Sequence, residues 1–196
     1  MKVIGIKGNY KNDAKETPSV YLMADSSLLK DGKPLFLPDF ADKFIAHPAL
    51  AVRINRLGKN IAKRFAPRYY DAVTVGLCIE AHDFSGSATI AYDDSIKNAF
   101  DGSAVLGDFI PVENCNLSDN TVLHLEQNGE VISETLLADM ILDIDSLIEE
   151  LSKYFTFKIG DILFTGYRQD GAFPLTINST ISGKLDSLEV LHFKVK

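Results

Sequence analysis

Short stretches of alternating apolar and polar residues recur along the chain and predict a protein made mainly of strands. Residues 2–7 (KVIGIK) alternate and stop at Gly8-Asn9, which predicts an edge strand followed by a turn. Residues 50–55 (LAVRIN) and 188–195 (LEVLHFKV) alternate in the same way. Residues 72–79 (AVTVGLCI) are almost continuously apolar, as expected of a strand covered on both faces.

Turn and cap signals add a hairpin and a helix. Asn128-Gly129 separates two runs within residues 121–132 and predicts a hairpin, because both central positions of such a turn need a positive φ. Residues 143–155 predict a helix that has Asp143 as N-cap and an apolar stripe at i, i+3, i+4 and i+7. Shorter patterns predict a strand over residues 35–37, a helix over 59–65 that ends before Pro67, and a strand over 161–166 that ends in a glycine turn.

Strands and helices do not alternate regularly, so the pattern indicates a mixed β-sandwich or β-roll rather than a Rossmann-like sheet. The length of 196 residues suits one compact domain. The hydrophobic fraction of 46% and the charged fraction of 24% are ordinary for a soluble globular protein.

Charge and cysteine content narrow the class of protein. The net charge of -7 argues against nucleic acid as the main partner, since phosphate binding needs clustered Lys and Arg. The densest basic stretch, residues 53–68, is either an anion-binding patch or a solvated face. Cys78 and Cys115 are too few for a disulfide framework. With no signal-peptide pattern and no apolar run long enough to cross a membrane, we expect a cytoplasmic protein without a membrane partner.

Six motifs, taken in their order along the chain, resemble the fumarylacetoacetate hydrolase family. The similarity runs from about Pro18 to the C-terminus, and it opens with the segment PSVYLMADSSLLKDGKPLFLPDF. The motifs are LAVRINRLGKNI, RYYD, VGLCIEAHD, AFDGSAVLGDFIP, QNGEVI and FKIGDILFTG.

The resemblance implies a fold, an assembly and a chemistry. The fold would be α+β and strand-rich, a β-roll of mixed sheets with a few peripheral helices. It would form a single domain over residues 1–196, with an N-terminal strand and mobile loop in 1–17 and the body of the roll in 18–196. The assembly would be a homodimer. The chemistry would be that of a hydrolase, isomerase or decarboxylase of small 2-oxo acids, using Mg²⁺ or Mn²⁺ held by an E-x-E pair and a later aspartate.

Matched position by position, the resemblance places the E-x-E pair at His47 and Ala49 and the aspartate ligand at Cys78. Glu80 then stands for a threonine and His82 for an arginine, while Asp83 matches. None of the three metal carboxylates is kept, so we expect no cofactor unless the family chemistry survives on other ligands.

The remaining family positions are partly changed. Asn98 stands where the family has a lysine, with Lys97 one step earlier, and Ala24 stands at a second lysine position. Thr165 and Gly166 match the segment that helps to hold the substrate carboxylate, but Tyr167 and Arg168 do not. The predicted residual pocket therefore consists of His47, Ala49, Cys78, Glu80, His82, Asp83, Lys97, Asn98, Thr165, Gly166 and Tyr167.

A site for a softer metal is a weaker alternative. His47 and Cys78 could supply two Zn²⁺ ligands, and Glu80 and His82 share the strand face of Cys78. Otherwise Cys78 is a small buried hydrophobe and His47 a loop residue. As a lid over the pocket, the polar segment 84–98 is a better candidate than the loop 11–17.

Three hypotheses follow for the function. The chain is an active enzyme on a small 2-oxo acid with unusual ligands or no metal, or a catalytically silent relative that binds a small carboxylate. The third hypothesis is a structural subunit of a heteromer with an active relative. The turn glycines and strand formers match the family while the ligand positions do not. This pattern is typical of a fold reused without its original chemistry.

Overall fold

The computed structural model of the protein describes residues 1–11, 17–85 and 94–196. Most of the predicted mobile loop (12–16) and of the predicted lid (86–93) lies outside these residues. None of the helices in the described ranges is long and apolar enough to cross a membrane.

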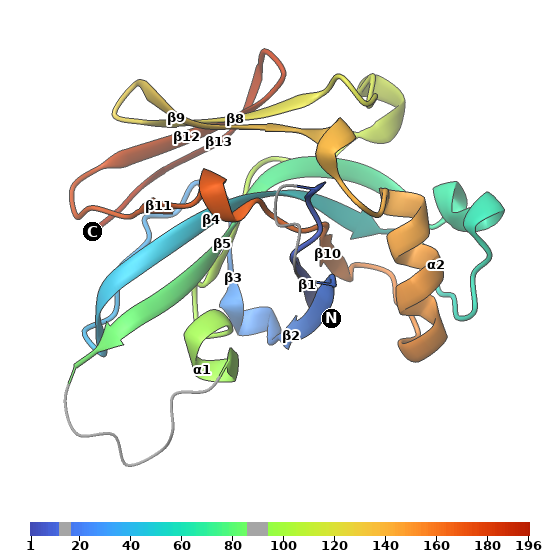
Figure 1. Ribbon diagram of the computed structural model, residues 1–196, viewed down its shortest axis with the longest axis horizontal. Helices are drawn as coiled ribbons and strands as arrows, with labels where there is room; N and C mark the ends of the chain where they lie inside the picture. Colours follow the sequence, from blue (N-terminus) through green and yellow to red (C-terminus); the bar gives the residue numbers. More distant parts are fainter. Residues whose placement is uncertain (12–16, 86–93) are drawn as a thin grey trace.

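Within these residues the chain forms two sheets, one large and one small (Figure 1). The large sheet has the order β2-β1-β10-β4-β5-β6-β3, with β11 paired to β4 and β7 paired to β5. Its strands are β1 (Val3–Lys7), β2 (Ser19–Met23), β3 (Leu28–Leu29), β4 (Ala41–Ile54), β5 (Tyr70–Phe84), β6 (Ala104–Leu106), β7 (Ile110–Pro111), β10 (Ile162–Phe164) and β11 (Phe173–Pro174). The small sheet has the order β13-β12-β8-β9, with β8 (Val122–Gln127), β9 (Glu130–Leu136), β12 (Thr180–Leu185) and β13 (Leu188–Lys194).

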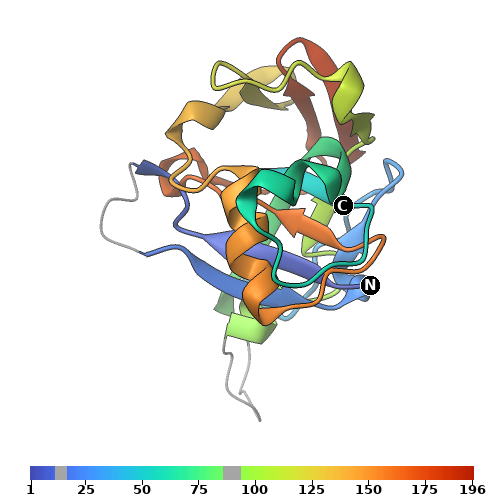
Figure 2. The same cartoon turned by 90° about the vertical axis from the view of Figure 1, so that its right-hand side faces the viewer.

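The helices are short and lie around the sheets. The α-helices are α1 (Asp94–Asn98) and α2 (Ile144–Tyr154). The 3₁₀ turns are η2 (Asp25–Ser27), η3 (Lys63–Arg68), η4 (Val112–Asn114), η5 (Leu137–Asp139) and η6 (Gln169–Gly171). In Figure 2, α2 stands beside η3, and the amide of Ile61 donates to Ser152 Oγ of α2 at 2.8 Å. The expected strand-rich α+β roll with a few peripheral helices is confirmed.

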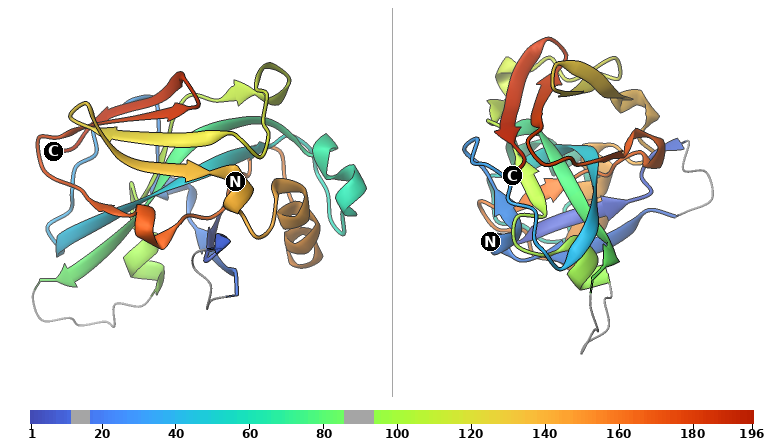
Figure 3. Two further views of the ribbon diagram at one scale, coloured as in Figure 1. Left: turned by 45° about the horizontal axis from the view of Figure 1, so that its top comes forward. Right: turned by 90° about the vertical axis from the view of Figure 1, so that its left-hand side faces the viewer.

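The long antiparallel pair β4–β5 is the centre of the molecule and has a core on each face. Figures 1 and 3 show the small sheet lying across one face, where Leu50, Val52 and Val75 pack with Leu123 and Leu125 of β8. The other face, toward α1 and β2, carries a smaller cluster with Ala49, Ala51, Cys78, Phe164 and Tyr167. Because both faces are covered, the continuous apolar run of β5 is explained.

The local sequence signals predicted some elements correctly. Asn128 (φ 54°) and Gly129 (φ 84°) both have the positive φ required at the β8–β9 turn. The predicted helix is α2, and the side chain of its N-cap Asp143 accepts from the amide of Ser146 at 2.8 Å.

Three local predictions were wrong. Residues 2–7 are not an edge strand, because β1 pairs with β10 on one side and with β2, the true edge, on the other. The helix expected over 59–65 is instead η3, which begins at Lys63 and contains Pro67; Asn60 has a φ of 52° and cannot continue a right-handed helix. Residues 35–37 form no strand, since Leu35 makes only an isolated bridge to Val195.

Candidate functional site

The register of β4 and β5 brings together the residues matched to the family's metal ligands, which come from these two strands. His47 lies directly opposite Cys78, and Ala49 lies opposite Gly76. Strand alternation puts Glu80 and His82 on the face of Cys78. His47 is therefore part of a central strand and only 2% exposed, so the expectation that it is a loop residue is wrong.

Four side chains surround the carboxylate of Glu80, and we call the five residues the Glu80 cluster. Lys7 Nζ of β1 lies 3.0 Å from Oε1, and Tyr167 Oη donates to the same oxygen at 2.8 Å. His47 Nε2 lies 3.6 Å and His82 Nε2 lies 3.4 Å from Oε2. Neither nitrogen of the His47 ring has a hydrogen-bond partner in the described part of the chain.

The cluster is closed at one end and reaches solvent at the other. The His47 side chain is 3% exposed and Tyr167 is fully buried, whereas His82 is 44% exposed. Lys7 and Glu80 are intermediate, at 22% and 17%. The more exposed end of the cluster is therefore the one that carries His82 and Lys7.

The charges of the cluster hold Glu80 in its ionised form. Burial alone would raise its pKa, but the pull of His47 and Lys7 more than offsets burial and holds the pKa of Glu80 well below its usual range. Lys7 is the closer of the two to the carboxylate, at 3.0 Å against 3.6 Å, and is therefore the nearest counter-charge of Glu80.

A glycine turn after β10 brings Tyr167 into the cluster. Gly166 has a φ of 114°, and a Cβ at this position would lie 2.6 Å from Cβ of Asn9. Glycine is therefore required here, both because φ is positive and because a Cβ would collide with Asn9. The turn lays the Tyr167 ring on the His47 imidazole, with centroids 4.1 Å apart. Before it, buried Thr165 donates its amide to Leu50 O and accepts from Asn9 Nδ2.

Cys78 is a buried thiol beside a buried phenol. Burial raises the pKa of Cys78 to about 12, although a hydrogen bond with Tyr21 works in the opposite direction. Burial likewise raises the pKa of Tyr21 well above its usual value. The ring of Tyr21 occupies the space that a side chain at Gly5 would need, since a Cβ there would lie 2.2 Å from Tyr21 Cζ. Cys78 is thus kept protonated in an aromatic and apolar setting.

The other predicted residues lie around the cluster rather than in it. Asp83 is exposed near the end of β5 and has a φ of 52°. Lys97 is exposed on α1, whereas its neighbour Asn98 is 2% exposed. Helix α1 contacts β5 and β2, so both residues lie on the same side of the large sheet as the cluster.

Sequence reasoning missed Lys7 and Tyr21. Their proximity to Glu80 and Cys78 depends on the strand order β2-β1-β10-β4-β5, which no local pattern reveals. One signal was present for Lys7. Lys7 points to the same face of β1 as Val3, which is buried on the side of the sheet that carries the site. A lysine on a buried strand face usually has a specific charged partner.

The positions matched to the family ligands do not fit a divalent ion. Ala49 has no donor atom, and the Cys78 thiol has a pKa of about 12 in a buried position. Glu80 already bonds to Lys7 and Tyr167. Over the described ranges, no group of three or more His, Cys, Asp or Glu side chains could hold a metal ion. The Zn²⁺ alternative on His47 and Cys78 therefore gains no third ligand.

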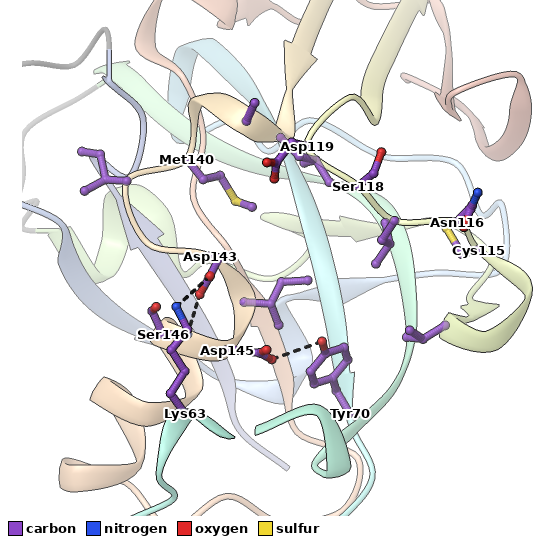
Figure 4. A pocket seen from close by; sticks show the side chains of 16 residues that line it. Lys63, Tyr70, Cys115, Asn116, Ser118, Asp119, Met140, Asp143, Asp145 and Ser146 are labelled. Atoms are coloured by element: carbon purple, nitrogen blue, oxygen red, sulfur yellow. Dashed lines mark hydrogen bonds and ion pairs between the residues drawn. The ribbon is translucent and has the colours of Figure 1, made fainter. Parts of the chain in front are cut away.

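A cavity of about 530 Å³ lies elsewhere, between the start of α2, Tyr70 of β5 and the loop 115–119 (Figure 4). Its lining includes three carboxylates, of Asp119, Asp143 and Asp145, against one ammonium, of Lys63. Lys63 Nζ bonds to Asp143 at 2.8 Å, and Tyr70 Oη donates to Asp145 at 3.2 Å (Figure 4). Burial raises the pKa of Asp145, and the charge of Asp143 adds to this although Tyr70 opposes it. This α2 cavity is therefore unsuited to an anion.

Comparisons with known proteins agree with the fold and the motifs. The family model "Fumarylacetoacetate (FAA) hydrolase C-terminal" matches residues 2–191. Oxaloacetate tautomerase YcgM of Escherichia coli (strain K12) is 30% identical over 194 residues, covering 94% of this chain and 88% of the relative.

Two solved structures give the same fold. A fumarylacetoacetate hydrolase family protein from Yersinia pestis CO92 has a TM-score of 0.85 and 25% identity, over 100% of this chain and 93% of that one. Fumarylpyruvate hydrolase from Pseudomonas aeruginosa, solved with Mn²⁺ and pyruvate, has a TM-score of 0.85 at 19% identity, over 100% and 89% of the two chains. The match of nearly the whole chain to the family model makes this protein a member of the fumarylacetoacetate hydrolase family.

Proposed function

We propose that this chain binds a small 2-oxo acid at the Glu80 cluster without a resident divalent metal, and that it does not carry out the metal-dependent reaction of its relatives. The observation that carries the proposal is the state of Glu80. Its carboxylate is already bonded by Lys7 and Tyr167, so its oxygens are not free to serve as the hard ligands that a divalent ion needs.

Charge around the open end of the cluster favours an anion. Lys43 lies directly opposite His82 in the β4–β5 register, and Lys97 lies on α1 on the same side of the sheet. With Lys7, three lysines of the described residues lie on the side of the large sheet that carries Glu80. Ammonium groups on this side would attract and orient a carboxylate ligand.

The relatives support the ligand class. The Escherichia coli relative is named an oxaloacetate tautomerase, and the Pseudomonas structure contains pyruvate. Both compounds carry a carboxylate next to a ketone. A ligand of that shape could place its carboxylate at Lys7 and His82, and its carbonyl toward the buried end, where His47 retains unused hydrogen-bonding capacity.

A second candidate is metal-free proton transfer on the same ligand. It is favoured by one observation, the pair of imidazoles on Oε2 of Glu80 at 3.6 and 3.4 Å. Keto–enol tautomerisation needs only a positioned acid and base. Turnover of oxaloacetate in metal-free buffer, lost in His47→Gln, would select this candidate over silent binding.

The test of the proposal measures binding and turnover on the same protein. Pyruvate and oxaloacetate are titrated calorimetrically after chelator treatment, and turnover is assayed with and without Mg²⁺ or Mn²⁺. We expect saturable binding that the metals do not improve, and no metal-stimulated turnover. Binding or turnover that appears only when Mg²⁺ or Mn²⁺ is added would overturn the proposal.

A further inference from the structure

We propose that the ammonium group of Lys7 supplies, as a cation tethered to the chain, the positive charge that a divalent ion supplies in a metal-dependent site, and that it excludes such an ion. The inference deepens the proposed function, and its ligand-binding half rests on that function. Its metal-excluding half concerns this chain's own residues and stands separately.

The end of β10 lets Lys7 reach Glu80. Strand β1 pairs with β10 only as far as Gly5, opposite Phe164, so Lys7 lies two residues beyond the paired region. On the other side of β10, pairing with β4 reaches only Ala51. Past this point the strand between β1 and β4 has ended, and the Lys7 side chain spans the distance to Glu80 on β5.

The Lys7 ammonium lies beside Glu80 and close enough to Cys78, one of the positions matched to the ligands, for its charge to act there. Lys7 Nζ is 3.0 Å from Oε1 of Glu80, and the other oxygen of this carboxylate, Oε2, lies 3.6 Å from His47 Nε2. The charge of Lys7 lowers the pKa of Cys78 in part, and its ammonium lies 5.4 Å from the centroid of Tyr21, the neighbour of Cys78. A divalent ion placed among His47, Cys78 and Glu80 would therefore meet a fixed like charge at close range.

Tyr167 and Gly166 make the arrangement rigid. Tyr167 Oη donates to the oxygen that Lys7 contacts, and its ring is held against His47. The Gly166 turn that fixes Tyr167 cannot be replaced without moving Asn9. Lys7 is thus paired to a carboxylate that Tyr167 also holds, and its side chain, 22% exposed, would be reached by a ligand carboxylate from solvent.

The metal half is tested with restored ligands. Mn²⁺ affinity is measured calorimetrically for the triple variant His47→Glu, Ala49→Glu, Cys78→Asp, and for the same triple variant with Lys7→Met added. We expect Mn²⁺ to bind the fourfold variant at least tenfold more tightly than the triple variant. Equal affinities, or tighter binding by the triple variant, would show that Lys7 does not exclude the ion.

The ligand half uses single variants, which keep the inference testable if the multiple variants do not fold. Pyruvate affinity is expected to fall at least tenfold in Lys7→Met and to be largely retained in Lys7→Arg. Lys184→Met is the matched control, because Lys184 pairs with Glu126 on the small sheet. An unchanged affinity in Lys7→Met contradicts the role of Lys7. Absence of pyruvate binding in the unaltered protein contradicts the proposed function instead, and the Mn²⁺ comparison still decides the metal half.

Discussion

Two polar regions of this molecule, the Glu80 cluster and the α2 cavity, differ in how they satisfy their charges. In the cluster one carboxylate has a lysine, a tyrosine and two histidines within 3.6 Å. In the cavity three carboxylates share one lysine around a hollow of about 530 Å³. The filled region lies where the family resemblance places chemistry, and the hollow one does not.

The difference shows why cavity size alone is a poor guide to the site in this chain. Pockets usually mark ligand sites, but in this chain the charges of Lys7 and His47 converge on Glu80 and hold its pKa well below its usual range. Its neighbours come from β1, β4, β5 and the turn after β10. Four separate segments converge on one carboxylate, whereas in the cavity Asp143 pairs with Lys63 and Asp145 accepts a hydrogen bond from Tyr70.

The largest expected effect is on the turn that carries Tyr167. Gly166→Ala should lower the free energy of unfolding by roughly 3 kcal/mol, since it adds overpacking against Asn9 to the strain of a positive φ. Gly160→Ala is the control: its φ is 87° but nothing lies within 4 Å of the added Cβ, so only about 1 kcal/mol is expected. Urea unfolding measures both, and equal losses would mean that the Asn9 contact is unimportant.

Removing the charge of Glu80 should come next. Glu80→Gln leaves the ammonium of Lys7 without its counter-charge, and we expect the free energy of unfolding to fall by about 2 kcal/mol. This is less than for a fully buried pair, because the Lys7 side chain is 22% exposed and solvent screens the interaction. Glu134→Gln, which removes a 61% exposed partner of His124, should change stability by less than about 0.5 kcal/mol. Similar values for the two variants would place Glu80 among ordinary surface pairs.

The same pair should give a pH dependence with a defined sign. The pKa of Glu80 is lowered in the folded state, so its contribution is fully present above the unfolded carboxyl pKa of about 4.3 and is lost as pH falls below it. The difference in melting temperature between the unaltered protein and Glu80→Gln should therefore be smaller at about pH 3 than at about pH 5. A difference that is larger at about pH 3 than at about pH 5 would contradict the assignment.

Two tyrosines allow a direct comparison of the regions. Tyr167→Phe removes the 2.8 Å hydrogen bond to the carboxylate of Glu80 and should lower the free energy of unfolding by about 1 kcal/mol. Tyr70→Phe removes a 3.2 Å bond to Asp145 at the cavity and should cost less, about 0.5 kcal/mol. Thermal unfolding of both variants ranks them, and a larger loss for Tyr70→Phe would reverse the comparison.

The smallest effect concerns the two thiols, one near the Glu80 cluster and one in the lining of the α2 cavity. Cys78 is buried with a pKa of about 12, whereas Cys115 lines the cavity and is only partly buried. An aromatic disulfide reagent should therefore label one thiol in the native protein and two after unfolding, and Cys115→Ser should abolish the native labelling. Rapid native labelling that survives Cys115→Ser would show that the Cys78 setting is open.

Features with local causes were predictable from the sequence. The Asn128-Gly129 turn and the Asp143 cap each depend on residues within one turn of each other. Strand β4 was only partly predicted, since it begins at Ala41 and runs through Pro48, where a proline normally argues against a central strand. Its other neighbours explain the exception: β10 pairs at Ala51–Arg53 and β11 at Ile45–Ala46, so neither pairs with β4 at Pro48.

The candidate site, too, contains residues that the sequence could locate and residues that only the strand order brings together. Matching the motifs located His47, Ala49 and Cys78 on paired strands, because residues in one register can be carried over by position. Lys7 could not be found this way, since 73 positions of sequence separate it from Glu80 and only the strand order joins them. The alternation of β1 marks Lys7 as a charged residue on the buried site face, but the sequence does not identify its partner.

The central claim, that a tethered ammonium takes the place of a divalent ion, is tested most directly by the spectrum of free Mn²⁺. Chelator-treated protein is added in excess to Mn²⁺, and the electron paramagnetic resonance signal of the unbound ion is recorded. The account predicts the same signal with and without the unaltered protein. A signal that falls in proportion to added protein, and that returns when excess Mg²⁺ displaces the bound Mn²⁺, would contradict it.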